Sequence, residues 1–230
     1  MKCVYPGLVS YVSHQSDWPL NRNTLEELSK TAIENDLLVV SDEIYEKLIF
    51  DNEEHVSIAS LPGMRERTIT LNGFSKAYSM TGWRLGYMAA PLEIIKCCVR
   101  VHQYINTCAS SFVQEAGITA LKEAEPDVQA MLKEYQRRRD YTVKALNEID
   151  GISCRKPKGA FYIFVNIKEL GMTSMEFAEY LLDNAGVAMV PGTAFGESGE
   201  GYVRLSYASS YENLVEACEK IKIAVEALRK

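Results

Sequence analysis

Two short segments place the strongest constraint on what this chain can fold into. Residues 37–41 form a continuous apolar run without the polar alternation of a one-sided strand, and residues 68–71 are interpreted in the same way. Such runs are typical of parallel strands that helices cover on both faces. Residues 23–34 have the apolar spacing of a helix, and residues 84–90 give a third strand candidate. This order predicts a layered α/β domain with a mostly parallel sheet.

The rest of the chain continues with helices and then with a smaller set of strands. Helical spacing extends over residues 92–113 and again over residues 125–149, a long charged helix that we interpret as a connector. Its charged run, residues 137–140, is expected to form a solvated face. The segments that follow are, in order, strand 161–167, helix 174–185, strand 187–190, strand 202–206 and helix 211–228. This pattern predicts a small α+β domain.

Composition and charge argue against several classes of partner. Acidic residues outnumber basic ones by 31 to 25, which gives a net charge of −6 and no basic field to attract nucleic acid or anionic lipid. The longest apolar stretches have the length of a strand, and the N-terminus lacks a basic-then-apolar export signal. We therefore expect a cytoplasmic protein that binds neither nucleic acid nor membrane.

Cysteine and histidine form no metal-ligand pattern in the sequence. The six cysteines show neither the CxxC spacing of a zinc site nor the density of a disulfide framework, so we interpret them as reduced packing residues. His14, His55 and His102 lie on different segments, and none is at helical ligand spacing from another. No metal site is predicted.

The first candidate functional residues follow the first strand, where the sequence reads SDEIY. Open α/β sheets bind ligands at the carboxyl ends of their strands. Asp42 and Glu43 come directly after the apolar run and Tyr45 follows shortly, so a carboxylate and a phenol can reach the same crevice. A helix cap or a surface charge is the alternative interpretation of Asp42.

A second candidate segment follows the next strand and reads NGFSKAYSMTGWRLGY. Lys76 lies among small and aromatic residues that include Phe74 and Ser75, which is a poor place for a solvated ammonium. Its amine is therefore expected to deprotonate easily, as a Schiff-base lysine requires. Arg84 is suited to bidentate capture of a phosphate. A surface lysine and an arginine with its head group in water are the alternatives.

A third candidate lies in the second half, within PGTAFGESGEGYVRLSYA. Arg204 sits inside an otherwise apolar strand, and a guanidinium buried there requires an anion. The preceding glycines form a loop in which backbone can approach closely. We favour a ligand as the anion, and a structural salt bridge is the alternative.

Four segments together resemble the class I, aspartate-aminotransferase-like aminotransferases, which are fold-type I pyridoxal-phosphate (PLP) enzymes. The segments read SDEIYEKLIFD, ITLNGFSKAYSMTGWRLGYMAAP, KGAFYIFVNI and GYVRLSYA. The resemblance implies that residues 19–140 form the C-terminal part of a PLP-binding large domain and residues 141–230 a small domain. Residues 1–18 do not match. The resemblance also implies a homodimer that transfers an amino group between an amino acid and a 2-oxo acid in amino-acid metabolism.

Carried over to this sequence, the resemblance implies a role for each candidate in the first domain. Lys76 holds the cofactor covalently and later moves the proton at the substrate's Cα. Asp42 pairs with the pyridine nitrogen, and Tyr45 donates a hydrogen bond to the ring's phenolic oxygen. Arg84 holds the cofactor phosphate, and Ser75 is expected to contact the cofactor as well.

In the second domain, the resemblance implies that Arg204 holds the substrate's α-carboxylate. Phe161 and Tyr162 are candidates for the side-chain pocket, although aromatic residues in a strand more often belong to the core. A carbon–sulfur β-lyase on the same scaffold is an alternative function, and a non-catalytic remnant is another.

Parts that the resemblance leads us to expect are missing from the sequence. Family members carry about as much chain again before these motifs, and an Asn-Pro-Thr-Gly signature precedes the helix that begins near Asn23. The sequence reads SYVSHQSDWPLNRN at that place. Truncation, a frameshift and true divergence would each produce this difference. Impaired transamination and weak cofactor binding are expected of the 230-residue chain.

Overall fold

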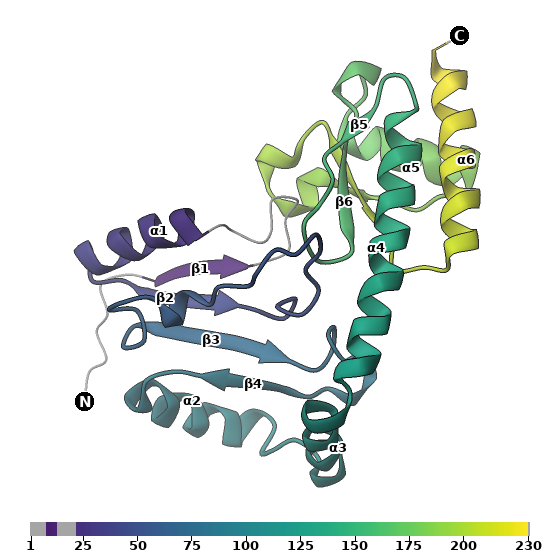
Figure 1. Cartoon of the computed structure of the whole chain (residues 1–230). Helices are drawn as coiled ribbons and strands as arrows, with labels where there is room; N and C mark the ends of the chain where they lie inside the picture. The colour runs from purple at the N-terminus through teal and green to yellow at the C-terminus, as the bar shows by residue number, and fades with distance from the viewer. Residues whose placement is uncertain (1–7, 13–21, 230) are drawn as a thin grey trace. The chain divides into compact units, whose positions relative to one another are not determined.

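The structure is a computed structural model that describes residues 8–12 and 22–229 (Figure 1). The chain divides into two compact units, residues 1–130 and 131–230. The division falls within the long helix α4 (Glu125–Asn147). Among the described residues, no helix combines the length and the apolar character needed to cross a membrane.

The first unit contains a four-stranded sheet in the order β1-β2-β3-β4. The strands are β1 (Leu8–Val12), β2 (Leu38–Asp42), β3 (Thr68–Gly73) and β4 (Gly86–Ala89). Strands β1, β2 and β3 are parallel, and β4 is antiparallel to β3. The register pairs Asp42 with Leu71, so the carboxyl ends of β2 and β3 lie at the same edge of the sheet.

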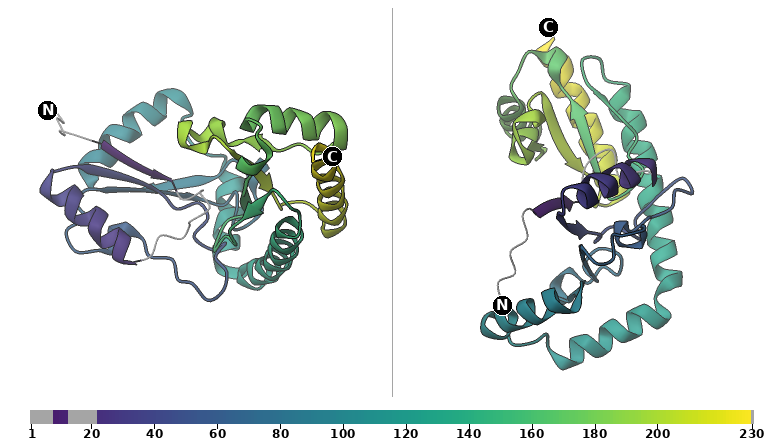
Figure 2. Two further views of the ribbon diagram at one scale, coloured as in Figure 1. Left: turned by 90° about the horizontal axis from the view of Figure 1, so that it is seen from above. Right: turned by 90° about the vertical axis from the view of Figure 1, so that its left-hand side faces the viewer.

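Helices flank this sheet on both faces. Figure 2 shows α1 (Arg22–Glu34) and α2 (Leu92–Ile105) on opposite sides of the strands. The other helices that belong wholly to this unit are α3 (Ser111–Glu123) and the 3-10 turns η1 (Ile58–Ser60) and η2 (Thr81–Trp83). The predicted mostly parallel sheet between helices is therefore confirmed, while β1 was not predicted.

The main buried cluster of the first unit packs against one face of β2. This cluster joins α1, β2 and the segment around η1, and its members are Leu25, Ala32, Val39, Ile58, Leu61 and Met64. Helix α2, in contrast, contains no buried residue. Its exposed large apolar side chains are Leu92, Val99, Val101, Tyr104 and Ile105.

The helix predicted over residues 92–113 is wrong, because the chain breaks between α2 and α3. Thr107 has a φ of 59°, in the left-handed region, which a continuous helix does not contain. The break falls in the sequence INTCASS, whose Asn, Thr and Ser side chains compete for backbone hydrogen bonds. Cys97 and Cys108 are exposed, so the interpretation of these two cysteines as packing residues is also wrong.

The second unit contains a separate antiparallel sheet in the order β5-β6-β8-β7. Its strands are β5 (Ser153–Cys154), β6 (Tyr162–Asn166), β7 (Val190–Pro191) and β8 (Tyr202–Ser206). Its helical elements besides α4 are α5 (Ser174–Ala185), α6 (Tyr211–Leu228), η3 (Lys168–Leu170), η4 (Gly192–Phe195) and η5 (Glu197–Gly199). The small α+β domain is confirmed, although the strand predicted at residues 187–190 is shorter and begins later.

Side chains of the central strands alternate between a core face and an open face. Ile163 and Val165 of β6 are buried, as are Val203 and Leu205 of β8. Helices α5 and α6 supply the matching apolar side chains, which are Phe177, Leu181, Leu214, Cys218, Ile221 and Val225. Arg204 pairs with Phe164 across the strands and therefore shares the other face.

Helix α4 contains one buried charge that the sequence did not indicate. Arg139 is 0% exposed, whereas Arg137 at the start of the same charged run has an exposed side chain. The Arg139 guanidinium donates to the Pro157 carbonyl oxygen at 2.9 Å and to Asp140 Oδ1 at 2.8–2.9 Å. The interpretation of the run as a solvated face is therefore wrong for Arg139, whose side chain is fully buried.

Candidate active site

The end of β2 carries the first two candidate residues. Asp42 is the last residue of the strand and is half-buried, and its Oδ1 accepts a hydrogen bond from Ile44 N–H at 3.2 Å. The chain then turns, and the Leu48 N–H donates to the Tyr45 carbonyl oxygen at 2.8 Å. Tyr45 is only 2% exposed, so its ring is fixed by the surrounding packing.

Lys76 lies in a tight turn directly after β3. The Phe74 carbonyl oxygen accepts from the N–H groups of Tyr78 and Met80, each at 3.3 Å, and closes this turn. Lys76 and the preceding Ser75 are half-buried. The Lys76 Nζ lies 5.9 Å from the centre of the Tyr45 ring. The fold thus brings the two sequence motifs together at one edge of the sheet.

Glycines allow the backbone around this turn to pack closely. A Cβ on Gly73 would lie 3.0 Å from the Leu85 carbonyl oxygen and 3.1 Å from Gly86 Cα. A Cβ on Gly117 of α3 would lie 2.6 Å from Leu85 Cδ2 and 3.3 Å from the Phe74 ring. Larger residues at either glycine would separate the strand ends or move α3 away from the lysine turn.

Arg84 follows the short helix η2 and extends toward solvent. Its φ is 54°, a left-handed conformation that is uncommon for residues other than glycine. Its Nη1 donates to the Thr81 carbonyl oxygen at 2.8 Å. No other hydrogen bond joins its guanidinium to the described part of the chain, so most of its donors face outward and can take an anion.

Arg204 lies in the second unit and is held by aromatic rings. Its guanidinium carbon is 4.2 Å from the centre of the Tyr162 ring and 4.2 Å from that of the Phe195 ring. The residue is half-buried rather than enclosed in the core, which corrects the expectation from its apolar strand. It makes no ion pair with any carboxylate in residues 22–229, so the alternative of a structural salt bridge is wrong within that range.

The candidate residues therefore fall into two groups. Asp42, Tyr45, Ser75, Lys76 and Arg84 all belong to the first unit. Arg204 belongs to the second unit.

Comparison with known proteins decides the family. A family model for aminotransferase class I and II matches residues 19–221. This chain belongs to that family. It is 53% identical over 205 residues to an aspartate aminotransferase of Pyrococcus abyssi, in a match that covers 88% of this chain and 52% of the relative. It is 49% identical over 205 residues to aromatic-amino-acid aminotransferase 2 of Thermococcus litoralis, with the same two coverages.

Solved structures of this aminotransferase family have the same fold. The aromatic aminotransferase from Pyrococcus horikoshii OT3 superimposes with a TM-score of 0.89 at 51% identity, over 91% of this chain and 57% of that one. The predicted fold-type I class and its partial extent are thereby confirmed. The chain spans about half the length of the curated relatives it matches, as the 52% coverage shows.

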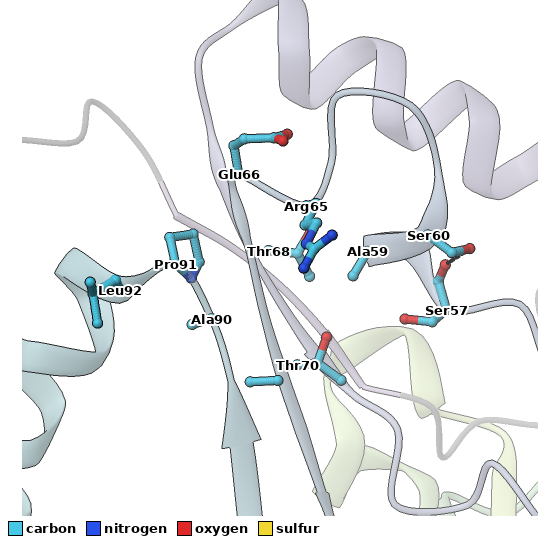
Figure 3. A pocket seen from close by; sticks show the side chains of 11 residues that line it. Ser57, Ala59, Ser60, Arg65, Glu66, Thr68, Thr70, Ala90, Pro91 and Leu92 are labelled. Atoms are coloured by element: carbon cyan, nitrogen blue, oxygen red, sulfur yellow. Dashed lines mark hydrogen bonds between the residues drawn. The ribbon is translucent and has the colours of Figure 1, made fainter.

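One cavity in the first unit lies away from these aminotransferase motifs. It has a volume of about 680 Å³, and Figure 3 shows the side chains around it. Its lining includes Thr68 and Thr70 near the start of β3 and Ala89 at the end of β4. Because Lys76 follows the opposite end of β3, this cavity belongs to the other edge of the sheet.

Sequence reasoning did not anticipate the burial of Glu43, which directly follows Asp42. Glu43 is 3% exposed, and its carboxylate contacts Ser41, His55 and Ser57. Burial alone would raise the pKa of this carboxyl, but the hydrogen bonds and the nearby imidazole hold the pKa below its usual value. The signal in the sequence was an acidic residue close behind the apolar run of residues 37–40.

Proposed function

We propose that this chain carries the PLP-holding lysine and the carboxylate-binding arginine of an aminotransferase. The reaction is transfer of an amino group between an amino acid and a 2-oxo acid. One observation carries the proposal: the Lys76 turn after β3 meets Tyr45 after β2, with a separation of 5.9 Å between Nζ and the ring centre. This is the edge at which a parallel sheet binds its ligand.

The side chains at this edge fit the functional groups of PLP. Lys76 offers an amine to the cofactor's aldehyde, and Asp42 offers a carboxylate to its pyridine nitrogen. Tyr45 offers a phenol to the ring oxygen. The outward donors of Arg84 suit the phosphate, and the Ser75 hydroxyl beside Lys76 is a further donor.

Each of these residues has a defined task in the proposed reaction. When bound, PLP supplies an electron-accepting ring that lets the amino acid lose its Cα proton. Lys76 would take this proton from Cα and deliver it to the cofactor carbon that carried the aldehyde. Asp42 keeps the pyridine nitrogen protonated through its negative charge. Tyr45 holds the ring oxygen with a phenol that packing has already oriented.

Arg204 is proposed to bind the α-carboxylate of the amino acid. Its planar donors match a carboxylate in a bidentate contact, and its guanidinium carbon lies 4.2 Å from the ring centres of Tyr162 and of Phe195. Phe161 is buried and stacks on Tyr135, whereas the Tyr162 ring contacts the arginine. The two relatives are named for aspartate and for aromatic amino acids, so the proposal covers amino acids as a class.

The proposal extends to the organisation of the complete enzyme. Residues 19–140 would contribute to the PLP-binding domain and residues 141–230 would form the small domain. A homodimer, a cytoplasmic location and a role in amino-acid biosynthesis belong to the proposal as well. Because the chain has about half the length of its relatives, we expect weak cofactor binding from the chain alone.

A chimera tests this proposal. The part of the Pyrococcus abyssi relative that precedes the match would be joined to residues 19–230 of this chain, to restore the family's length. Incubation with PLP, reduction with borohydride and peptide mapping should place the cofactor on Lys76. The chimera should then transfer the amino group of an amino acid to a 2-oxo acid, measured as formation of the new amino acid.

The matched control is Lys76→Arg, which keeps the charge but cannot form the covalent bond. It should fold with an unchanged circular dichroism spectrum and lose the label. A folded chimera that takes no label, or that is labelled at another lysine, would overturn the proposal. If the chimera released ammonia and pyruvate from an amino acid when no 2-oxo acid acceptor had been added, its reaction would be β-elimination and not transamination.

A further inference from the structure

Glu43 is the buried centre of a small polar cluster in the first unit. Its Oε1 accepts from the hydroxyls of Ser41 at 2.9 Å and Ser57 at 2.8 Å. Its Oε2 lies 2.9 Å from His55 Nε2. Among the buried charged side chains of residues 22–229, Glu43 is the carboxylate and Arg139 the cation. A carboxylate withdrawn from water is stable only where partners such as these satisfy its oxygens.

The cluster fixes the backbone on either side of Glu43. The Glu43 N–H donates to the Leu71 carbonyl oxygen of β3 at 2.8 Å, and the Glu46 N–H donates to the Glu43 carbonyl oxygen at 3.0 Å. The side chain and both backbone groups of Glu43 are thus held at once. Asp42 precedes this residue, and Tyr45 lies within the turn that it opens.

Because Ser41 and Glu43 are held, strand geometry fixes the direction of the Asp42 side chain between them. Successive residues of a strand project to opposite faces. Ser41 and Glu43 lie on the same side, because the Ser41 hydroxyl donates to the Glu43 carboxylate. The Asp42 side chain therefore projects to the other side. Holding Ser41 and Glu43 from one face of the sheet directs the Asp42 carboxylate to the opposite face.

We propose that the contact between Glu43 and His55 is a positioning device that holds Asp42 and Tyr45 at the end of β2. Neither residue touches the cofactor in this proposal; both act through the backbone. His55 comes from the segment that follows Phe50 and precedes η1, so the contact ties that segment to the strand end. The role of the contact in positioning Asp42 and Tyr45 for catalysis rests on the proposed function. The anchoring of the strand end does not, because it can be measured on the chain without cofactor.

A metal ion bridging this cluster is the competing explanation. Ligand atoms of Glu43, Glu46 and His55 lie within 4.8 Å of one another. Both Glu43 oxygens, however, already accept hydrogen bonds from Ser41, Ser57 and His55 in this structure. These contacts engage both carboxylate oxygens, which favours anchoring over metal binding.

Amide hydrogen exchange on the 230-residue chain tests the anchoring directly. His55→Ala should increase the exchange rates of the Glu43, Ile44 and Glu46 amides on the order of tenfold or more, because a partner of the buried carboxylate is removed. Amides of α1 in the same unit should keep their rates. His55→Gln should restore most of the protection, since its amide can donate to the carboxylate. Glu54→Gln, an exposed neighbour in the same segment, should change nothing.

Other results would overturn the inference. Equal acceleration throughout residues 22–130 would mean that His55 merely stabilises the whole unit. Unchanged exchange in His55→Ala would mean that the contact holds nothing, and loss of protection on adding a metal chelator to the wild type would assign the cluster to an ion. If His55→Ala fails to fold, Ser57→Ala removes one of the other donors and should produce a smaller local increase.

A kinetic measurement on the chimera separates positioning from cofactor chemistry. His55→Ala should lower kcat about tenfold or more through misplaced Asp42 and Tyr45, while KM for the amino acid should stay near the wild-type value because Arg204 is untouched. An unchanged kcat would overturn the inference. If the wild-type chimera is never labelled at Lys76, the proposed function fails, whereas the exchange result would still decide whether the anchoring exists.

Discussion

The Lys76 amine and the Tyr45 ring lie within 5.9 Å of one another, and each is supplied by a different strand end. Tyr45 follows β2, and Lys76 follows β3, so the parallel pairing of these strands assembles the two. Substitutions that weaken the pairing of β2 with β3 should therefore move Lys76 and Tyr45 apart, even where neither residue is changed.

Replacement of Asp42 by asparagine should separate cofactor retention from turnover. In the chimera, Asp42→Asn keeps the size of the side chain but removes the charge that favours a protonated pyridine nitrogen. PLP should remain attached to Lys76, and kcat should fall to a small fraction of the wild-type value. Borohydride labelling and steady-state rates measure the two effects separately. Turnover close to that of the wild type would remove Asp42 from its proposed role.

Replacement of Arg204 by lysine should weaken substrate binding without disturbing the cofactor. Lysine keeps the positive charge but loses the planar pair of donors and the stacking on Tyr162 and Phe195. The value of kcat/KM for amino acids should fall by about 2–4 kcal/mol in free-energy terms. Labelling of Lys76 should be unchanged.

An amine that lacks the carboxylate provides the control for this arginine. The amine has nothing for Arg204 to bind, so its half-reaction rate should be the same in the chimera and in Arg204→Lys. Equal losses for the amine and the amino acid would make Arg204 a structural residue of β8.

The buried guanidinium of Arg139 should contribute to the stability of the second unit. Arg139→Met preserves most of the apolar stem but removes the donors to Pro157 and Asp140. We expect the free energy of unfolding to fall by about 1–3 kcal/mol, measured as faster amide exchange in β6 and α5. Lys144→Met on the exposed side of α4 should change it by less than about 0.5 kcal/mol. Equal effects of the two changes would contradict the role of the buried charge.

The pH dependence of stability should reveal the anchored carboxylate of Glu43. Its pKa in the folded chain lies below the ordinary value of 4.5, so the ionised form stabilises the fold above that pH. This contribution is lost as the pH falls through the lower, folded pKa. Near neutral pH, Glu43→Gln should therefore be less stable than the wild type. On acidification it should lose less stability than the wild type does.

Tryptophan fluorescence can follow this unfolding, because both tryptophans, Trp18 and Trp83, precede residue 131. Urea titrations at several pH values would compare the wild type, Glu43→Gln and Glu54→Gln. Glu54 is exposed and should behave as the wild type does. Parallel pH profiles for the wild type and Glu43→Gln would show that the buried carboxylate does not contribute.

Local sequence pattern predicted the second unit well because its elements have clear ends. Helix α5, strand β8 and helix α6 have the predicted bounds, and Thr173 and Ser210 cap the two helices with their side chains. Strands β1 and β5 were missed. Each is defined by pairing with a neighbour rather than by its own residues, so periodicity along the chain carries little information about it.

For the candidate site, the sequence predicted the residue types at strand ends but not their partners. Proximity of Lys76 to Tyr45 depends on strand order, and the aromatic rings around Arg204 depend on register and on the turn at Phe195. Burial of Arg139 and Glu43 likewise depends on long-range packing. The sequence shows only that a charge is present, and the fold determines whether water reaches it.

The pairing of β2 with β3 has a consequence for how this region can change over evolution. Loss of one residue from β2 would move Glu43 into the position of Asp42, and gain of one would bring Ser41 there. A deletion would keep a carboxylate at the strand end yet leave the Ser57 and His55 donors without their acceptor. Exchange of one apolar residue for another leaves every side chain of β2 on its original face of the sheet. Substitutions in β2 should therefore be common among descendants of this sequence, and single-residue insertions or deletions rare.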